Sequence, residues 1–323
     1  MKFISDHREK FPLKRMCQLL DVSVQGWRKH DRGTMQPSQR DRENKDLSQR
    51  IKKIHRLSRE AYGSPRITIA LHREGTRCGH NRVARLMREG GIAGKQQKRF
   101  RVQTTQSDHG YAVAPNLAAR MHTSGRNQLW RADITYIATD EGWAYLAAIL
   151  DEHTRKIVGW SMQTTLKSDL VIDALKMAIR IQRPPKGLVH HSDRGVQYAC
   201  QEYRKLLDHV GIQASMSRKG NCYDNATMES FFGTMKREQI DQLCYRSLRE
   251  ARHEVFSYIE GFYNPYRIHT SLGGLSPQQM EDGDRFAQRP SPPTNCKGPF
   301  SAMAPGYPAT IDDDNPLTFI SNN

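Results

Sequence analysis

Residues 129–138 read Leu-Trp-Arg-Ala-Asp-Ile-Thr-Tyr-Ile-Ala and place one carboxylate, Asp133, inside a run of residues that favour a β-strand. Two further β-rich runs follow at 143–151 and 156–163, separated from it and from each other by short polar turns. This spacing predicts an antiparallel meander of three strands. An ionised carboxylate within a strand needs a cation, a metal ion or several backbone donors beside it. The stretch therefore indicates a sheet that carries an acidic site.

The chain after the meander alternates between helical and strand patterns. Ser168 is a candidate cap for the first of these helices, which the Pro184-Pro185 pair ends. The predicted elements are a helix at 168–182, a strand at 187–191, a helix at 200–210, a strand at 212–216 and helices at 224–239 and 248–263. The order of three strands, helix, strand, helix, strand and helix is typical of an RNase H-like fold. We expect an α/β domain with a mixed five-stranded sheet and flanking helices.

Two more carboxylates fall at positions that suit a shared site. Asp193 ends the strand Leu-Val-His-His-Ser-Asp, and Glu229 lies on the 224–239 helix. Each acid alone could equally be a helix cap or an ion-pair partner. Three clustered carboxylates would repel one another unless a divalent cation held them, and such hard oxygen ligands select magnesium or manganese over zinc. Lys236 lies seven residues after Glu229, which is about two helical turns, so it shares that face and could reach a DNA phosphate.

The net charge of +16 is confined to the first part of the chain. Residues 1–132 contain 29 lysine and arginine residues against 11 aspartate and glutamate residues, a net charge of +18. The remaining residues contain 21 against 23, a net charge of −2. A basic segment followed by a near-neutral one favours binding of a polyanion by the first part, and nucleic acid is the natural partner. A merely well-solvated surface is the alternative.

The basic part contains two helical patterns that suit DNA binding. Residues 1–32 form a helix-turn-helix-like segment, in which Leu13, Met16, Leu19 and Leu20 supply an apolar stripe and Ser23 caps a helix that exposes Arg28 and Lys29. Residues 45–95 form a second helix-turn-helix module. Its third helix is predicted to present Arg82 and Arg85. A basic linker at 96–126 and an integrase-sized core at 127–282 follow, and residues 283–323 have the composition of a disordered tail.

Four strings of the sequence closely resemble one family. They are Trp-Arg-Ala-Asp-Ile-Thr-Tyr-Ile at 130–137, His-Ser-Asp-Arg-Gly-Val-Gln-Tyr at 191–198, Asp-Asn-Ala-Thr-Met-Glu-Ser-Phe-Phe at 224–232 and Tyr-Asn-Pro-Tyr-Arg-Ile-His-Thr-Ser-Leu at 263–272. The chain resembles, over about residues 1–282, the second-frame product (OrfB) of the insertion sequence 3 family. These proteins are transposases of the DDE retroviral-integrase superfamily.

The resemblance implies a fold, a chemistry and a set of partners. It implies an integrase catalytic core whose triad, carried over to Asp133, Asp193 and Glu229, binds two magnesium ions, and a Lys236 that contacts transposon-end DNA. We therefore expect cleavage and joining of DNA strands at terminal inverted repeats, by a homo-oligomer on DNA. We expect no zinc, because the His-His-Cys-Cys module of retroviral integrases has no counterpart here. No heptad run is visible, so a first-frame (OrfA) product could be a partner or a fusion.

Several residues near the site have more than one interpretation. His190 could tune a metal ion or a water molecule, or be structural. Asn225 could orient Glu229 or cap its helix. Arg267 and His269 could contact DNA or the surroundings of the triad. The four tryptophan and tyrosine residues on the strands could stack on bases, although strand aromatics more often fill the core: Trp130, Tyr136, Trp143 and Trp160.

Other classes of function are disfavoured by the sequence. The longest apolar run is eight residues, at 143–150, which is too short to span a membrane. The charged start lacks a secretory signal, and six scattered cysteines argue against a disulfide framework, so we expect a bacterial cytoplasmic protein on the nucleoid. No P-loop or Gly-x-Ser-x-Gly elbow is present, so neither a nucleotide cofactor nor a serine nucleophile is expected. A DNA-binding regulator with an inactive nuclease fold and an RNase H-type nuclease remain as alternatives.

Overall fold

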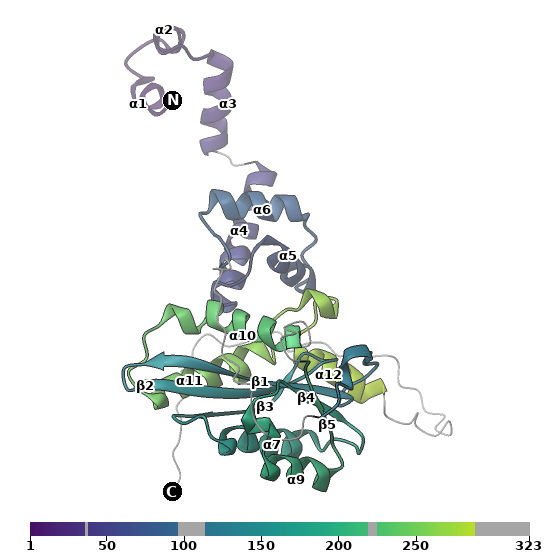
Figure 1. Ribbon diagram of the computed structural model, residues 1–323. Coiled ribbons are helices and arrows are strands. Elements are labelled where there is room, and N and C mark those ends of the chain that lie inside the picture. Colours follow the sequence, from purple (N-terminus) through teal and green to yellow (C-terminus); the bar gives the residue numbers. More distant parts are fainter. Residues whose placement is uncertain (36–37, 96–113, 219–224, 288–323) are drawn as a thin grey trace, which may run out of the picture. The chain divides into compact units, whose positions relative to one another are not determined.

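The computed structural model describes residues 1–35, 38–95, 114–218 and 225–287, and it is built around one five-stranded sheet (Figure 1). The strands are β1 (Leu129–Thr139), β2 (Gly142–Asp151), β3 (Ile157–Gln163), β4 (Val189–Ser192) and β5 (Gln213–Met216). Their order is β3-β2-β1-β4-β5. The first three pair antiparallel, whereas β4 lies parallel to both β1 and β5. The predicted meander and mixed sheet are confirmed.

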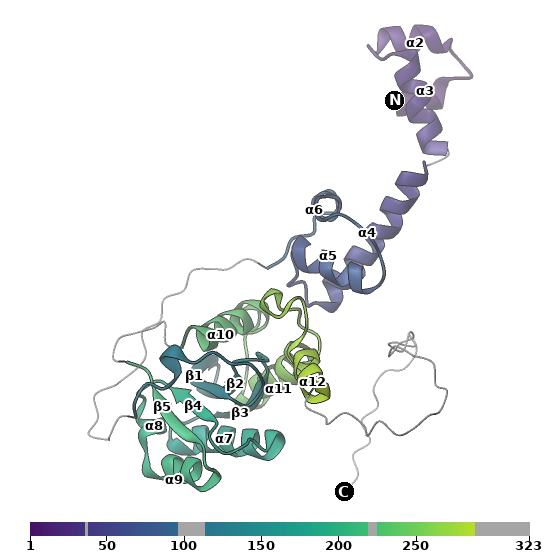
Figure 2. The same cartoon turned by 90° about the vertical axis from the view of Figure 1, so that its right-hand side faces the viewer.

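Each face of the sheet is covered by its own set of helices (Figures 1 and 2). One core packs side chains from α7 (Ser168–Gln182), α8 (Val196–Ala199) and α9 (Gln201–Val210) against the sheet. The other core contains side chains of α10 (Ala226–Glu238), α11 (Leu248–Tyr258) and the π-helical continuation Ile259–Tyr263. Because both faces are buried, β2 reads as a nearly continuous apolar run from Trp143 to Leu150 instead of an alternating one.

The approach of α7 to β3 depends on one glycine. A Cβ atom at Gly159 would lie 2.3 Å from the backbone oxygen of Ala174 and 2.8 Å from the Cβ of Ala178. These distances are below van der Waals contact, so any side chain at this position would push the helix away from the sheet. The small residues Ala174 and Ala178 on the facing side of α7 serve the same close packing.

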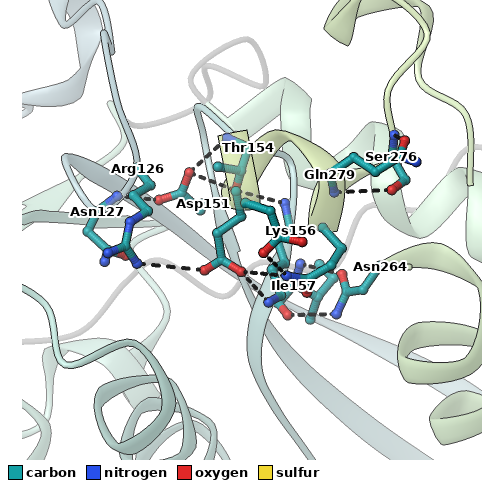
Figure 3. A network of polar contacts seen from close by, with 12 residues as sticks. Arg126, Asn127, Asp151, Thr154, Lys156, Ile157, Asn264, Ser276 and Gln279 are labelled. Atoms are coloured by element: carbon teal, nitrogen blue, oxygen red, sulfur yellow. Dashed lines mark hydrogen bonds and ion pairs between the residues drawn. The ribbon is translucent and has the colours of Figure 1, made fainter. Parts of the chain in front are cut away.

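A buried polar network closes the end of the β2–β3 hairpin (Figure 3). The carboxylate of Asp151 accepts hydrogen bonds from the backbone N–H of Asn127 at 2.7 Å and of Thr154 at 2.8 Å. Lys156 forms an ion pair with Glu281, and the side chain of Asn264 pairs with the backbone of Ile157 in both directions. The network therefore joins the hairpin to α12 (Pro277–Ala287), a helix that the sequence pattern did not predict.

The first helical segment has its own small core. It comprises α1 (Lys2–His7), α2 (Leu13–Leu19) and α3 (Val24–Met35), and Ile4, Met16, Cys17 and Trp27 are buried within it. Ser23 accepts a hydrogen bond from the Gly26 N–H at 2.9 Å and caps α3 as expected. The predicted apolar stripe is wrong for Leu19 and Leu20, which are exposed because the buried face of α2 turns through Met16 and Cys17 instead.

The second helical module is formed by α4 (Gln39–Leu57), α5 (Ser64–Arg73) and α6 (His80–Glu89). Its helix α4 begins six residues earlier than the predicted module, because Ser38 caps it by accepting a hydrogen bond from Asp41 N–H. The module packs on the core through apolar and polar contacts. Its buried side chains belong to the same hydrophobic cluster as those of α10 and α11, and the Tyr62 ring packs near Phe262. The Tyr62 hydroxyl accepts from the Ile268 N–H at 2.7 Å, and Arg59 donates to Gln239 and Ser257.

Three further expectations need correction. Ser168 is the first residue of α7 and makes no capping hydrogen bond, because Lys167 occupies the cap position. The described part of the predicted linker, residues 114–126, packs on the sheet, with Ala118 buried against Leu129 and Val189. Residues 283–287 of the predicted tail belong to α12, and the rest of that tail, like linker residues 96–113, lies outside the described residues. No described helix is long and apolar enough to cross a membrane.

Candidate active site

Asp133 lies on β1, and Asp193 directly follows the neighbouring strand β4. The parallel pairing of β1 and β4 matches Trp130 with His190 and Arg131 with His191. Asp133 and Asp193 each lie two residues beyond this last pair, so the same register sets them level with one another at adjacent positions. Asp133 accepts a hydrogen bond from the Ile134 N–H at 2.8 Å, and Asp193 accepts one from the Gly195 N–H at 2.9 Å. Both carboxylates are half-buried.

The third acid comes from the first turn of α10. Glu229 is exposed, while the neighbouring Phe231 and Phe232 on the same helix are buried in the core. Asn225, at the cap position of α10, donates from its side chain to the backbone oxygen of Ala132 at 3.3 Å. It makes no side-chain capping hydrogen bond, so it instead ties the start of the helix to the residue next to Asp133.

The three acids influence one another electrostatically. Burial, together with the charges of Asp193 and Glu229, raises the pKa of Asp133 to about 8. Partial removal of Glu229 from solvent also raises the pKa of this otherwise exposed acid. No three His, Cys, Asp or Glu side chains among the described residues are grouped so that they could hold a metal ion. Asp193 and Glu229 thus lie close enough to Asp133 to raise its pKa, but the described residues form no closed ligand set.

Lys236 lies on the same side of the sheet as the acids. Its Nζ atom is 4.8 Å from the centroid of the Tyr136 ring, a cation–π contact between α10 and β1. Burial lowers the pKa of Lys236, and the carboxylates of Asp241 and Asp133 oppose this effect. Tyr136 in turn packs edge-on against Trp143, whose side chain is 54% exposed. Trp130, by contrast, is fully buried and fills the core.

Three of the other candidates have partners other than the acids; His190 and Arg267 are buried, and His269 is half-buried. His190 is hydrogen-bonded to the Tyr203 hydroxyl at 2.9 Å, and burial lowers its pKa to about 4. Arg267 donates two hydrogen bonds to Glu238, at 2.7 and 2.9 Å. His269 packs edge-on against the Tyr263 ring. These contacts favour the structural interpretation of His190, and they place Arg267 and His269 on the far flank of α10.

The predicted DNA-binding arginines of the helical modules lie at the surface. Arg28 and Lys29 are exposed on α3. Arg82 contacts Glu43 and Asn44 of α4, and Arg85 forms an ion pair with Glu89 on its own helix. Surface pairs of this kind are worth about 0–1 kcal/mol, so they leave both arginines available to a stronger anionic partner.

The sequence interpretation missed Glu238 altogether. Its carboxylate is buried, accepts from Arg267 and from the Tyr258 hydroxyl, and lies 4.0 Å from Arg66 of α5. These partners lower its pKa despite the opposing effect of burial. Polar residues flank Glu238 in the sequence, so no local pattern marks it as buried. The only sequence signal for its partner Arg267 is the polar, aromatic-rich string at 263–272 in which that residue lies.

Comparison with known proteins agrees with this architecture. Family models described as an integrase core domain match residues 123–222 and 210–277, and one described as an HTH-like domain matches residues 41–100. Together with the sheet, these matches define the class: the chain is a transposase, an enzyme that transfers polynucleotide strands. It belongs to the insertion sequence 3 family of transposases, as the similarity to the family's curated members shows.

Two of these relatives cover most of the chain. "Transposase InsF for insertion sequence IS3A" from Escherichia coli (strain K12) is 37% identical over 281 residues, 87% of this chain and 97% of the relative. "Insertion element IS600 uncharacterized 31 kDa protein" from Shigella sonnei is 45% identical over 271 residues, 83% of this chain and 97% of the relative. Among solved structures, the HTLV-2 integrase catalytic core domain in complex with magnesium matches 50% of this chain and 99% of its own, with 17% identity and a TM-score of 0.39.

Proposed function

We propose that Asp133, Asp193 and Glu229 are the catalytic and metal-binding carboxylates of this transposase, which cleaves and joins DNA strands at the ends of its insertion sequence. The observation that carries the proposal is the placement of the three acids: Asp133 lies on β1, Asp193 directly follows the neighbouring strand β4, and Glu229 lies in the first turn of α10. The raised pKa of Asp133, caused by burial and by the two other acids, supports it. A carboxylate that is costly to ionise beside two others is the arrangement that a bound divalent cation would stabilise.

The donor set suits magnesium or manganese. All three candidate ligands are carboxylates, which are hard oxygen donors. Two such ions would supply activation of the attacking hydroxyl group and stabilisation of the leaving 3′ oxygen in an in-line displacement. Asp133 and Asp193 would hold their positions through the register of the sheet, and Glu229 would approach them on α10. No nucleotide cofactor enters this scheme.

Lys236 would then bind DNA and would not accept or donate a proton in the reaction. Its Nζ atom lies above the Tyr136 ring, and the charge of Asp133 favours its protonated form. It would therefore contact a phosphate at the edge of the acidic site. Arg28, Lys29, Arg82 and Arg85 would contact the backbone of the terminal repeats or of target DNA further away. A homo-oligomer on DNA and an OrfA partner or fusion belong to the same proposal.

The test is a strand-transfer assay with the full chain and a duplex that carries the insertion-sequence end. We expect products with Mg²⁺ or Mn²⁺ and none with EDTA. Glu229→Gln should abolish joining and leave binding of the duplex nearly unchanged, whereas Glu202→Gln, an exposed acid on α9 at the opposite face, should not affect either. Equal loss of binding and joining in Glu229→Gln would contradict the assigned role.

A further inference from the structure

A cavity of about 380 Å³ opens on the flank of α10 that carries Thr227, Ser230 and Thr234. Its wall on the helix side is polar, with the hydroxyl groups of Thr227 and Ser230. Arg155 reaches it from the β2–β3 turn, and Thr270 and Ser271, both exposed, lie at its rim. The cavity is therefore accessible from solvent and rich in hydrogen-bond donors.

Three arginines line this cavity, and none of its described lining residues is acidic. They are Arg66 of α5, Arg155 and Arg267. The acids that balance them lie behind the wall: Glu238 holds Arg267 and lies 4.0 Å from Arg66, and Glu152 is paired with Arg155 at 3.4 Å. The three arginines thus line the cavity, whereas the acids that pair with them are not among its described lining residues. Such an arrangement attracts anions.

The pKa of His269 reflects the positive charge of the arginines around the cavity. Burial and the charges of Arg267, Arg66 and Arg155 lower its pKa to about 3, so the ring is neutral. Its Nε2 atom is buried and has no hydrogen-bond partner among the described residues. A buried ring nitrogen without a partner costs free energy unless a ligand or water meets it. The same three arginines that disfavour a charged histidine would favour a bound anion.

The cavity and the acidic site share one helix. Ser230 follows Glu229 directly on α10, so their side chains are separated by about 100° around the helix axis. Lys236 lies on the Glu229 side, whereas Thr227 and Thr234 lie on the cavity side. A DNA strand that passes the acids would thus have one flank of α10 within reach on its path.

We propose that this cavity binds one phosphate group of the bound DNA strand, held by Arg155 and Arg66 with the hydroxyl groups of the rim. This rests on the proposed function, since the DNA is the substrate of the acidic site. Arginine matches the geometry of a phosphate with paired N–H donors, and serine and threonine hydroxyls complete the shell. The site anchors a phosphodiester away from the cleaved bond and sets the direction of the strand across α10.

The first measurement is equilibrium binding of the full chain to an end duplex in EDTA, at several salt concentrations. Arg155→Gln should weaken binding about tenfold and reduce the slope of log affinity against log salt by about 0.9, the share of one phosphate. Ser271→Glu, which adds a negative charge at the rim, should also weaken binding. Arg155→Lys, which keeps the charge but loses the paired N–H donors, should weaken binding less than Arg155→Gln and leave the salt slope unchanged, and it guards against a mere loss of turn structure.

Matched controls lie on the opposite face of the sheet. Arg180→Gln on α7 and Gln201→Glu on α9 change the charge by the same amounts at exposed positions. The second measurement replaces single phosphates of the duplex by neutral methylphosphonates. At one position of the duplex, this replacement should weaken binding by wild type but cause no further loss of binding by Arg155→Gln. If both cavity variants match their controls, or if no position behaves in this way, the proposal is wrong.

A melting experiment with inorganic phosphate distinguishes two possible occupants of the cavity, a phosphate group of DNA and a free anion. If phosphate raises the melting temperature of wild type but not of Arg155→Gln, while DNA affinity is the same for both, the occupant is a free anion and the DNA assignment is overturned. All of these readouts are binding or melting measurements made without strand transfer. Failure of the proposed function would instead appear as retained joining in Glu229→Gln, and the two failures can be told apart.

Discussion

The Nζ atom of Lys236 lies 4.8 Å from the centre of the Tyr136 ring. The contact joins a helix residue seven positions after Glu229 to a strand residue three positions after Asp133. It therefore links α10, which carries Glu229, to β1, which carries Asp133. The ring also restrains a long side chain that would otherwise be free to rotate, and it does so without neutralising the charge that a DNA phosphate would meet.

Lys236→Ala should weaken end-DNA binding and reduce strand transfer, about tenfold each, because one phosphate contact is lost. Lys236→Arg should keep much of both, since an arginine can also stack on Tyr136 and contact a phosphate. The assays are duplex binding and strand transfer, with Lys176→Ala on α7 as an exposed control. An arginine variant that binds DNA normally but is as inactive as Glu229→Gln would assign the lysine to the chemical step.

The buried ion pair between Glu238 and Arg267 should be costly to break. Replacing Arg267 by Met leaves an uncompensated buried carboxylate, and such changes cost about 3–5 kcal/mol. The measurement is urea unfolding of the full chain. Arg183→Met, an exposed arginine after α7, is the control and should change stability little. A loss below about 1 kcal/mol for Arg267→Met would show that water reaches the pair.

The same pair sets a direction for the pH dependence of stability. The pKa of Glu238 is lowered in the folded state, mainly by Arg267, so its contribution is present above the ordinary pKa of 4.5 and is lost as pH falls through the lower folded value. Glu238→Gln should therefore lower the melting temperature most at neutral pH, and the difference from wild type should shrink towards pH 3. A constant difference across this range would contradict the assignment.

Asp133 should have the opposite effect. Its pKa is raised to about 8 in the folded state, so the folded chain binds a proton more tightly than the unfolded chain, and stability falls as pH rises from about 4 to 8. In EDTA, Asp133→Asn should raise the melting temperature at pH 8 and change it little at pH 4. Adding Mg²⁺ should stabilise wild type at pH 8 but not this variant.

Gly159→Ala should destabilise the chain by about 1–3 kcal/mol, because its Cβ would lie 2.3 Å from the Ala174 oxygen and force α7 off the sheet. Gly233→Ala is the natural comparison, since no atom lies within 4 Å of a Cβ added there on α10. Removing a glycine from a helix interior should add roughly 0.5–1 kcal/mol. Both values come from urea unfolding.

The sequence by itself determined the order and the type of the core elements. The predicted strands at 129–138, 143–151 and 156–163 differ from the structure by at most one residue at either end, and the helix at 168–182 matches its bounds. These elements are long, apolar or clearly periodic, and proline and glycine punctuate them, so the information is local. The placement of Asp133 within a strand and Asp193 after one followed from the same local patterns.

Only the tertiary structure decided which residues meet and which are covered. Leu57 continues the apolar stripe of α4 but is exposed. The helix packs through Leu47, Ile51 and Ile54, and Leu57 at its C-terminal end lies beyond these contacts. The Glu238–Arg267 pair joins residues 29 positions apart in the sequence, and a charged residue in either place is expected at the surface from its local sequence. Such contacts depend on how helices approach one another, and that geometry comes from the packing of the whole core and not from any local period.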